Sequence, residues 1–271
     1  MAESIQSGLV QATQVAREAA VRRAANGIGF AAFGETGLDD ADLVRMVQAV
    51  PTAVAAALGR KTYYFVPLAL AEGRGSESAG HRSGNEETMV SPIYSVELAE
   101  MAICHRNVTL GGGADAGEEG VFISTRLLGD RFSLAFELFI NVGHAFVDEA
   151  GVPESFGELV WNQTMADVRG ETSLDAWESR AQAVGGGQTA GRGGQPKTDE
   201  KARTEYIEAA FSDAIAIYLL SLAVDFDYSE LREREYPLLA PQALAERLRL
   251  VARLFPPNAE YEFAIRYRRR A

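Results

Sequence analysis

Residues 130–149, DRFSLAFELFINVGHAFVDE, form the most apolar helical pattern of the chain and decide the predicted fold. Four polar residues interrupt the pattern, Glu137, Asn141, His144 and Asp148, and their spacing places all four on one helical face. Apolar residues cover the rest of the helix, as is typical of a helix buried in a core. A polar stripe on such a helix must be paired, hydrated or metal-bound. We therefore expect this stripe to mark the candidate site.

A second apolar helix, expected from Glu200 to Leu222, carries a comparable stripe. Its polar residues Glu205, Glu208 and Ser212 face one way. If the two striped helices pack face to face, His144 should lie within hydrogen-bonded or water-bridged reach of Glu205 or Glu208.

The other elements follow from apolar periodicity, caps and chain breakers. Helices are expected over residues 4–26, 38–58 with a break at Pro51, 153–168, 172–177 and 240–254. Strands are expected over residues 62–70, where Pro67 indicates a sheet edge, 108–110, 120–124 and 260–267. Residues 185–198, GGGQTAGRGGQPKT, have too little apolar surface to order themselves, which predicts a flexible loop. The sequence shows no internal repeat, and we expect a single α+β domain over residues 1–271.

Composition limits the classes of partner and the compartment. A net charge of −12 argues against nucleic-acid binding, because proteins of that class need a basic face. The single cysteine, Cys104, excludes an intramolecular disulfide and a cysteine-rich zinc site. The apolar run 209–224 is short for a membrane span and contains Asp213. Together with the lack of a signal-peptide pattern, these features indicate a cytoplasmic protein that binds neither nucleic acid nor membrane.

The two striped helices resemble the paired active-site helices of zincin metallopeptidases. In that family the first helix carries H-E-x-x-H, whose histidines bind zinc and whose glutamate activates a metal-bound water. In the gluzincin branch a later helix supplies a glutamate as third ligand, often within E-F-F-A-E-A-F. Here GHAF at residues 143–146 is similar to the end of the first motif, and EYIEAAF at residues 205–211 to the second. The position of the third ligand is Glu205 in one alignment and Ala209 in another.

The resemblance covers residues 120–222 and implies a fold as well as a site. The expected strand 120–124 precedes the first helix, as an edge strand does in zincins. The implied fold class is therefore α+β, mainly helical and zincin-like, with a small mixed sheet before the central helix. Its expected parts are helices and strands in residues 1–119, a zincin-like core in residues 120–222, and a helix and a strand in residues 223–271.

The zinc-binding histidine pair is missing in either register of the motif. With His144 as the second histidine, the first falls on Ile140 and the general-base position on Asn141. In the other register Glu137 keeps the general-base position, but Phe136 and Ile140 replace both histidines. A catalytic zinc needs three protein ligands and a water, so neither register predicts the standard peptidase site.

Three interpretations follow. In the first, a zincin-like scaffold without peptidase activity or cofactor has a binding or structural role, with a peptide or protein as the partner it would bind. Glu137, Asn141, His144 and Glu205 then form a buried hydrogen-bonded network. In the second, a metal-dependent hydrolase holds manganese, iron or magnesium with ligands drawn from His144, Glu137, Glu205 and Glu208. Glu137, Asn141 and His144 would then be the catalytic candidates. In the third, the chain is an α+β protein unrelated to peptidases, whose striped helices only pack together.

Overall fold

The computed structural model describes residues 8–71, 88–110, 117–127, 131–185, 199–228 and 236–266. The chain divides into two compact units, Met1–Leu138 (unit 1) and Phe139–Ala271 (unit 2). The division falls inside the central helix α6, Arg131–Ala150, which matches the helix expected over residues 130–149. The α+β class is confirmed, while the single domain over residues 1–271 stays a prediction.

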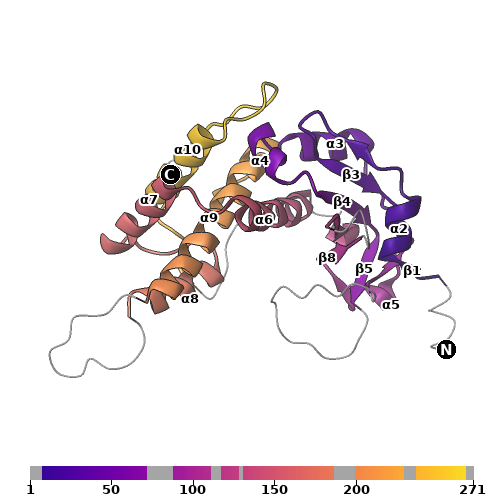
Figure 1. The fold of residues 1–271 in the computed structure, drawn as a ribbon, viewed down its shortest axis with the longest axis horizontal. Helices are drawn as coiled ribbons and strands as arrows, with labels where there is room; N and C mark the ends of the chain where they lie inside the picture. The colour runs from indigo at the N-terminus through magenta and orange to yellow at the C-terminus, as the bar shows by residue number, and fades with distance from the viewer. Residues whose placement is uncertain are drawn as a thin grey trace. The chain divides into compact units, whose positions relative to one another are not determined.

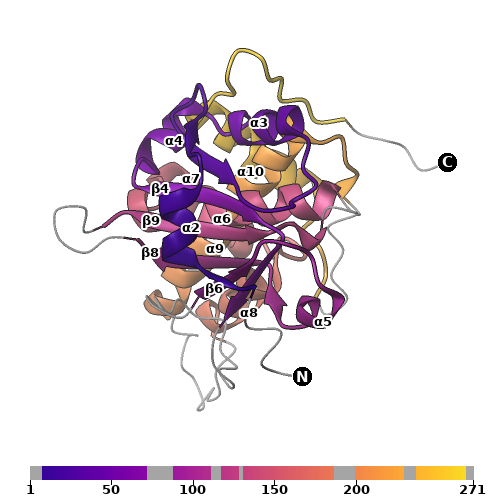
Figure 2. The ribbon, with the colours of Figure 1, turned by 90° about the vertical axis from the view of Figure 1, so that its right-hand side faces the viewer.

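The described part of unit 1 contains a mixed sheet with the strand order β2-β3-β4-β9-β8. Figure 2 labels the neighbouring strands β4, β9 and β8 of this sheet. Its strands are β2 (Arg22–Arg23), β3 (Gly29–Ala32), β4 (Lys61–Val66), β9 (Glu119–Ser124) and β8 (His105–Thr109). β3, β4 and β9 are parallel, with Tyr63 opposite Phe30 on one side and Val121 on the other. β2 and β8 are antiparallel to their neighbours. The small mixed sheet expected before the central helix is therefore present, but its edge beside β9 is β8. The expected edge position of strand 120–124 is wrong.

A second sheet in the described part of unit 1 is antiparallel, with the order β1-β6-β5-β7. Its strands are β1 (Val10–Gln11), β6 (Thr88–Ser91), β5 (Leu68–Ala71) and β7 (Ala102–Ile103). Only Pro67 separates β4 from β5, so the chain passes from one sheet to the other at this residue. The sheet edge expected at Pro67 is wrong, because β4 lies between β3 and β9. The missing N–H of the proline falls at the junction, where neither ladder needs it.

Short helices complete unit 1. They are α2 (Ala12–Glu18), α3 (Asp40–Gln48), α4 (Thr52–Ala57), α5 (Val96–Ala99) and the 3₁₀ helix η1 (Thr125–Leu127). The break expected at Pro51 is confirmed, and the Asp39 carboxylate accepts from the first N–H groups of α3. Of the expected helix 4–26, residues 4–7 lie outside the described residues and α2 is confirmed, whereas the chain after α2 turns back to form β2. α2 packs Ala12 and Val15 onto the buried aromatic residues Tyr64 and Phe122, and so covers one face of the mixed sheet.

Unit 2 is built around one long helix, α9 (Glu200–Ala223) (Figure 1). The helices α7 (Glu154–Met165), α8 (Leu174–Ala183) and α10 (Pro241–Leu254) each pack against it. Every residue from Ala210 to Leu220 is buried. Among the described helices, α9 has the length and apolar composition to cross a membrane. Its burial is that of a core helix, which explains the same composition.

Three further predictions concern unit 2: a helix, a loop and a C-terminal strand. The helix expected over residues 172–177 is α8, which Ser173 caps by accepting from the Ala176 N–H at 3.2 Å. Residues 186–198 of the expected flexible loop lie outside the described residues. The strand expected over residues 260–267 is wrong as far as the structure describes it, to Arg266. In its place Phe263 packs edge-on against Tyr218 of α9, with 5.2 Å between ring centroids, so this residue contacts a helix.

Candidate functional site

The polar stripe of α6 is buried or half-buried in its first half and exposed in its second half. Glu137 is half-buried and Asn141 is buried, whereas His144 and Asp148 are exposed. The expectation of a buried stripe is therefore wrong for its second half. Periodicity in the sequence does not distinguish exposed from buried positions of a polar stripe.

Glu137 is held by a histidine that the sequence did not point to. His105, at the start of the edge strand β8, places its Nδ1 atom against the Oε1 atom of the Glu137 carboxylate. The histidine side chain is 42% exposed and the glutamate side chain 15%. Both residues belong to unit 1. The strand expected over residues 108–110 begins three residues earlier, and this extension brings His105 to the helix.

The acidic residues expected to face α6 from α9 are on the surface. Glu205 is exposed and pairs with Lys201 on its own helix, with 3.4 Å between the charged atoms. Glu208 is exposed as well, and the side chain turned into the core between them is Tyr206. A buried network of Glu137, Asn141, His144 and Glu205 is therefore not what the structure shows.

α6 and α9 do meet, at a glycine instead of a histidine. A Cβ atom placed on Gly143 would lie 2.5 Å from the carbonyl oxygen of Ser212, so only glycine allows this approach. Ser212 is buried. In the GHAF run that resembles a peptidase motif, the glycine is therefore explained by close helix packing. The histidine next to it, His144, is exposed.

The candidate ligands do not assemble into a site for the zinc of a zincin. Within residues 8–71, 88–110, 117–127, 131–185, 199–228 and 236–266, no three His, Cys, Asp or Glu side chains gather closely enough to hold a metal. His105 and Glu137 supply one nitrogen and one oxygen, whereas catalytic zinc takes three protein ligands. Among the residues that the structure describes, this pair falls short of the ligand set of a catalytic zinc.

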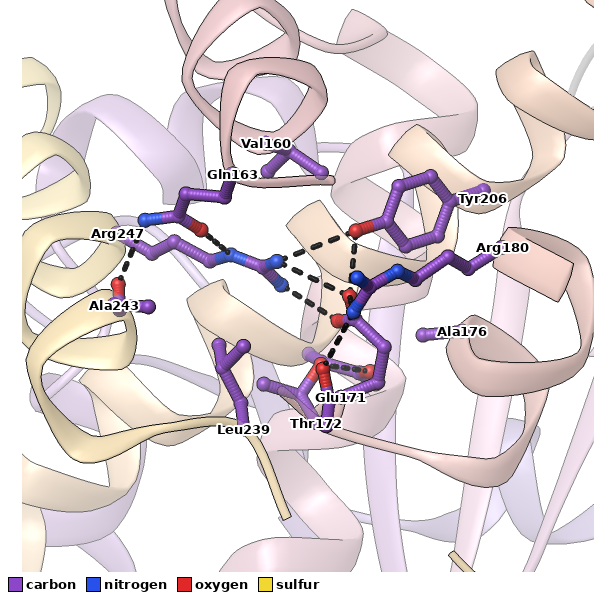
Figure 3. A network of polar contacts seen from close by, with 12 residues as sticks. Val160, Gln163, Glu171, Thr172, Ala176, Arg180, Tyr206, Leu239, Ala243 and Arg247 are labelled. Carbon is purple, nitrogen blue, oxygen red and sulfur yellow. Dashed lines mark hydrogen bonds and ion pairs between the residues drawn. The ribbon is translucent and has the colours of Figure 1, made fainter. Parts of the chain in front are cut away.

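A second polar arrangement lies in unit 2, around Glu171, which is between α7 and α8 in the sequence. Figure 3 shows Arg247 of α10 reaching the Glu171 carboxylate from one side and Tyr206 and Arg180 from the other. Arg247 donates from Nη1 to Glu171 Oε2 at 2.9 Å and from Nη2 to Oε1 at 3.3 Å. The Tyr206 hydroxyl donates to Oε1 at 2.6 Å, and Arg180 Nη1 donates to the same oxygen at 3.3 Å. Glu171 and Arg247 are both fully buried. We call Glu171, Arg247, Tyr206, Arg180 and their hydrogen-bond partners the Glu171 network.

Further contacts tie the network to α7, to α10 and to the segment before α10. Gln163 of α7 accepts from Arg247 Nε at 2.8 Å and donates to the Ala243 carbonyl at 3.2 Å. Thr164 donates to the Tyr206 hydroxyl oxygen at 2.9 Å. The backbone of Glu171 is held too, because its N–H donates to the Pro237 carbonyl at 3.0 Å and its carbonyl accepts from the Leu239 N–H at 2.9 Å. Residues 171 and 238 form a parallel bridge there.

Burial and neighbouring charges shift the pKa values of Tyr206 and Arg247 in opposite directions. Burial raises the pKa of the Tyr206 phenol to about 12, although Arg247 lowers it, so the hydroxyl stays a donor. Burial alone would lower the pKa of Arg247, but its attraction to Glu171 and Tyr206 raises the pKa above the usual value. Two guanidinium groups and a phenol thus fix one carboxylate.

The sequence offers little signal for this network. Glu171 and Arg247 are 76 positions apart, and neither belongs to a polar stripe on an apolar helix. Its chemistry is that of a satisfied, water-excluded ion pair, which orients elements and offers no atom to a substrate. No protein-family model and no curated protein matches this chain.

Proposed function

We propose that this chain is a zincin-like scaffold without peptidase activity that binds a peptide or protein. The arrangement in unit 1 supports this proposal. β9 runs through η1 toward α6, and the neighbouring edge strand β8 contacts the same helix through His105 and Glu137. A small mixed sheet and a following helix are the parts that the resemblance to zincins implies, although the edge strand is β8 and not the implied strand 120–124.

The observation that carries the proposal is the pairing of Glu137 with His105. A general base of a zinc peptidase must direct its carboxylate at a water on the metal. Here the acid in that position is engaged by an imidazole, and Phe136 stands where a zinc ligand belongs. The Phe136 ring stacks on Phe132, with 6.1 Å between centroids and 5° between planes. This part of the helix therefore offers apolar surface and one polar pair, which suits binding better than hydrolysis.

The second candidate is a metal-dependent hydrolase with a nonstandard site. The observation in its favour is the same pair, because an imidazole and a carboxylate suit manganese or iron. It requires further ligands, and none joins His105 and Glu137 among the described residues. The charge of −12 makes a peptide or protein the expected partner in either case, since a nucleic acid would be repelled.

Metal content and proteolysis together test the proposal. The full chain is purified without chelator or affinity metal, its zinc, manganese and iron are measured by mass spectrometry, and cleavage of an unfolded casein substrate is followed. We expect metal well below one ion per chain and no cleavage. Near-stoichiometric metal that is lost in His105→Ala and Glu137→Gln, but kept in the surface control Glu154→Gln, would refute the scaffold and support the hydrolase.

A further inference from the structure

Asp213 is a buried acid on α9, within unit 2, that the Glu171 network does not use. Its Oδ2 atom accepts from the Thr172 hydroxyl at 2.7 Å, and the Ser173 hydroxyl also donates to the carboxylate. The Ser173 oxygen at the same time accepts from the Ala176 N–H and so caps α8. One carboxyl group thus fastens both the segment after Glu171 and the start of α8 to α9.

The groups that face Asp213 from the neighbouring elements have opposing effects on its charge. Glu171 disfavours the ionised form by repulsion, and Arg247 of α10 favours it by attraction. The Tyr228 phenol also faces it, and its own pKa is raised, first by burial. Arg180 of α8 binds Glu171. Across the part of the chain that the structure describes, no cation forms an ion pair with Asp213 itself.

Burial is the largest influence on Asp213 and raises its pKa to about 6, although the two hydroxyl donors lower it. An aspartate in water has a pKa of about 3.9. The acid is therefore easier to ionise when water reaches it than when the Thr172 segment closes over it. Closure is favoured by the neutral acid, because burying an ionised carboxylate without a cation is costly.

We infer that Asp213 is a proton-dependent lock on residues 171–173, closed firmly while the acid is neutral and weakened when it ionises. The stabilisation of the closed form is complete below the pKa of the hydrated acid. It is lost as the pH rises through the higher pKa of the closed form. The lock operates within unit 2 and does not depend on the proposed function.

Opening residues 171–173 also releases the segment 236–240. Two backbone bonds join the two segments, from the N–H of Glu171 to Pro237 at 3.0 Å and from the N–H of Leu239 to Glu171 at 2.9 Å. A third, from the N–H of Ala240 to Arg169 at 3.0 Å, lies just before residue 171. The Tyr236 hydroxyl adds a bond of 3.1 Å to the Thr172 carbonyl. The amide protons of Glu171 and Leu239 therefore report directly on opening.

The test is hydrogen exchange of the full chain at pH 5 and pH 8, corrected for the intrinsic pH dependence of exchange. We expect the protection of the Glu171 and Leu239 amides to fall about tenfold over this interval, from the two pKa values above. Asp213→Asn cannot ionise and should show no such fall. Asp40→Asn, which removes an exposed acid in unit 1, should behave as the wild type.

A second variant keeps the inference testable if Asp213→Asn does not fold. Thr172→Val removes one donor to the carboxylate, so the pH midpoint of the change in protection should move upward. Constant protection in the wild type between pH 5 and pH 8 would overturn the lock. So would an unchanged pH dependence in Asp213→Asn, or an unmoved midpoint in Thr172→Val.

Discussion

Replacing Glu171 by glutamine should destabilise unit 2 severely. The substitution keeps the shape of the side chain but removes the charge that four hydrogen bonds from Arg247, Tyr206 and Arg180 satisfy, at 2.6 to 3.3 Å. The amide nitrogen of glutamine would also face donors, and a buried guanidinium would lose its counter-charge. Removing one partner of a buried ion pair costs about 3–5 kcal/mol, and full burial of both Glu171 and Arg247 places this pair in that class. We expect a loss in the free energy of unfolding within that range.

The assay follows from where the tryptophans lie. The sequence contains two, Trp161 in α7 and Trp177 in α8, so intrinsic fluorescence during urea unfolding reports on unit 2 alone. The matched control is Glu205→Gln, which breaks the exposed pair with Lys201 and should change stability by no more than about 0.5 kcal/mol. The quantity compared is the free energy of unfolding extrapolated to water at equal slope.

Two results would refute this reasoning. One is a loss for Glu171→Gln below about 1 kcal/mol, which is the range of surface pairs. The other concerns the double variant Glu171→Gln with Arg247→Met. It should lose less than the sum of the two single variants, because Arg247 no longer remains as an uncompensated charge. Strict additivity would mean that the two side chains are not coupled.

Two glycines give further predictions, read by the same urea unfolding. Gly170→Ala should cost at least about 2 kcal/mol, because φ is +82° and the new Cβ would lie 2.1 Å from the Leu238 carbonyl oxygen; wild-type stability would contradict the described approach of residues 170 and 238. Gly143→Ala should cost about 1–3 kcal/mol by forcing α6 from Ser212, while the adjacent exposed control His144→Ala should stay within about 0.5 kcal/mol. A larger effect at residue 144 than at residue 143 would reverse our account of this helix.

The long helices could be predicted because each carries its own signals. α6 has apolar periodicity and α9 has a long, nearly continuous apolar run, and Ser173 supplies an N-cap next to α8 in the sequence. The position of a strand within its sheet is harder to predict from the sequence. Pro67 does mark a strand boundary, but whether β4 lies inside or at the edge of its sheet depends on β9, which is far away in the chain.

The candidate site could be predicted only in part, because it depends on burial and on distant partners. Glu137 could be expected to need a partner, but His105 is 32 positions away and belongs to a strand whose start has no strong signal. His144 has the same local pattern as Asn141, yet one is exposed and the other buried. That difference is set by what packs against the helix, which periodicity does not encode. The Glu171 network likewise depends on charged residues, and the sequence around each of them does not indicate that it is buried.

The passage of the chain from β4 to β5 through the single residue Pro67 bears on how unit 1 can fold and be engineered. Val66 and Leu68 are both fully buried and belong to different sheets, so the chain has no slack between them. An inserted residue would turn the side chains of one strand to its opposite face or force a bulge into a ladder. Neither sheet can therefore form as an independent module. A circular permutant or a domain insertion should be tolerated at an exposed loop of unit 1, but not at this junction.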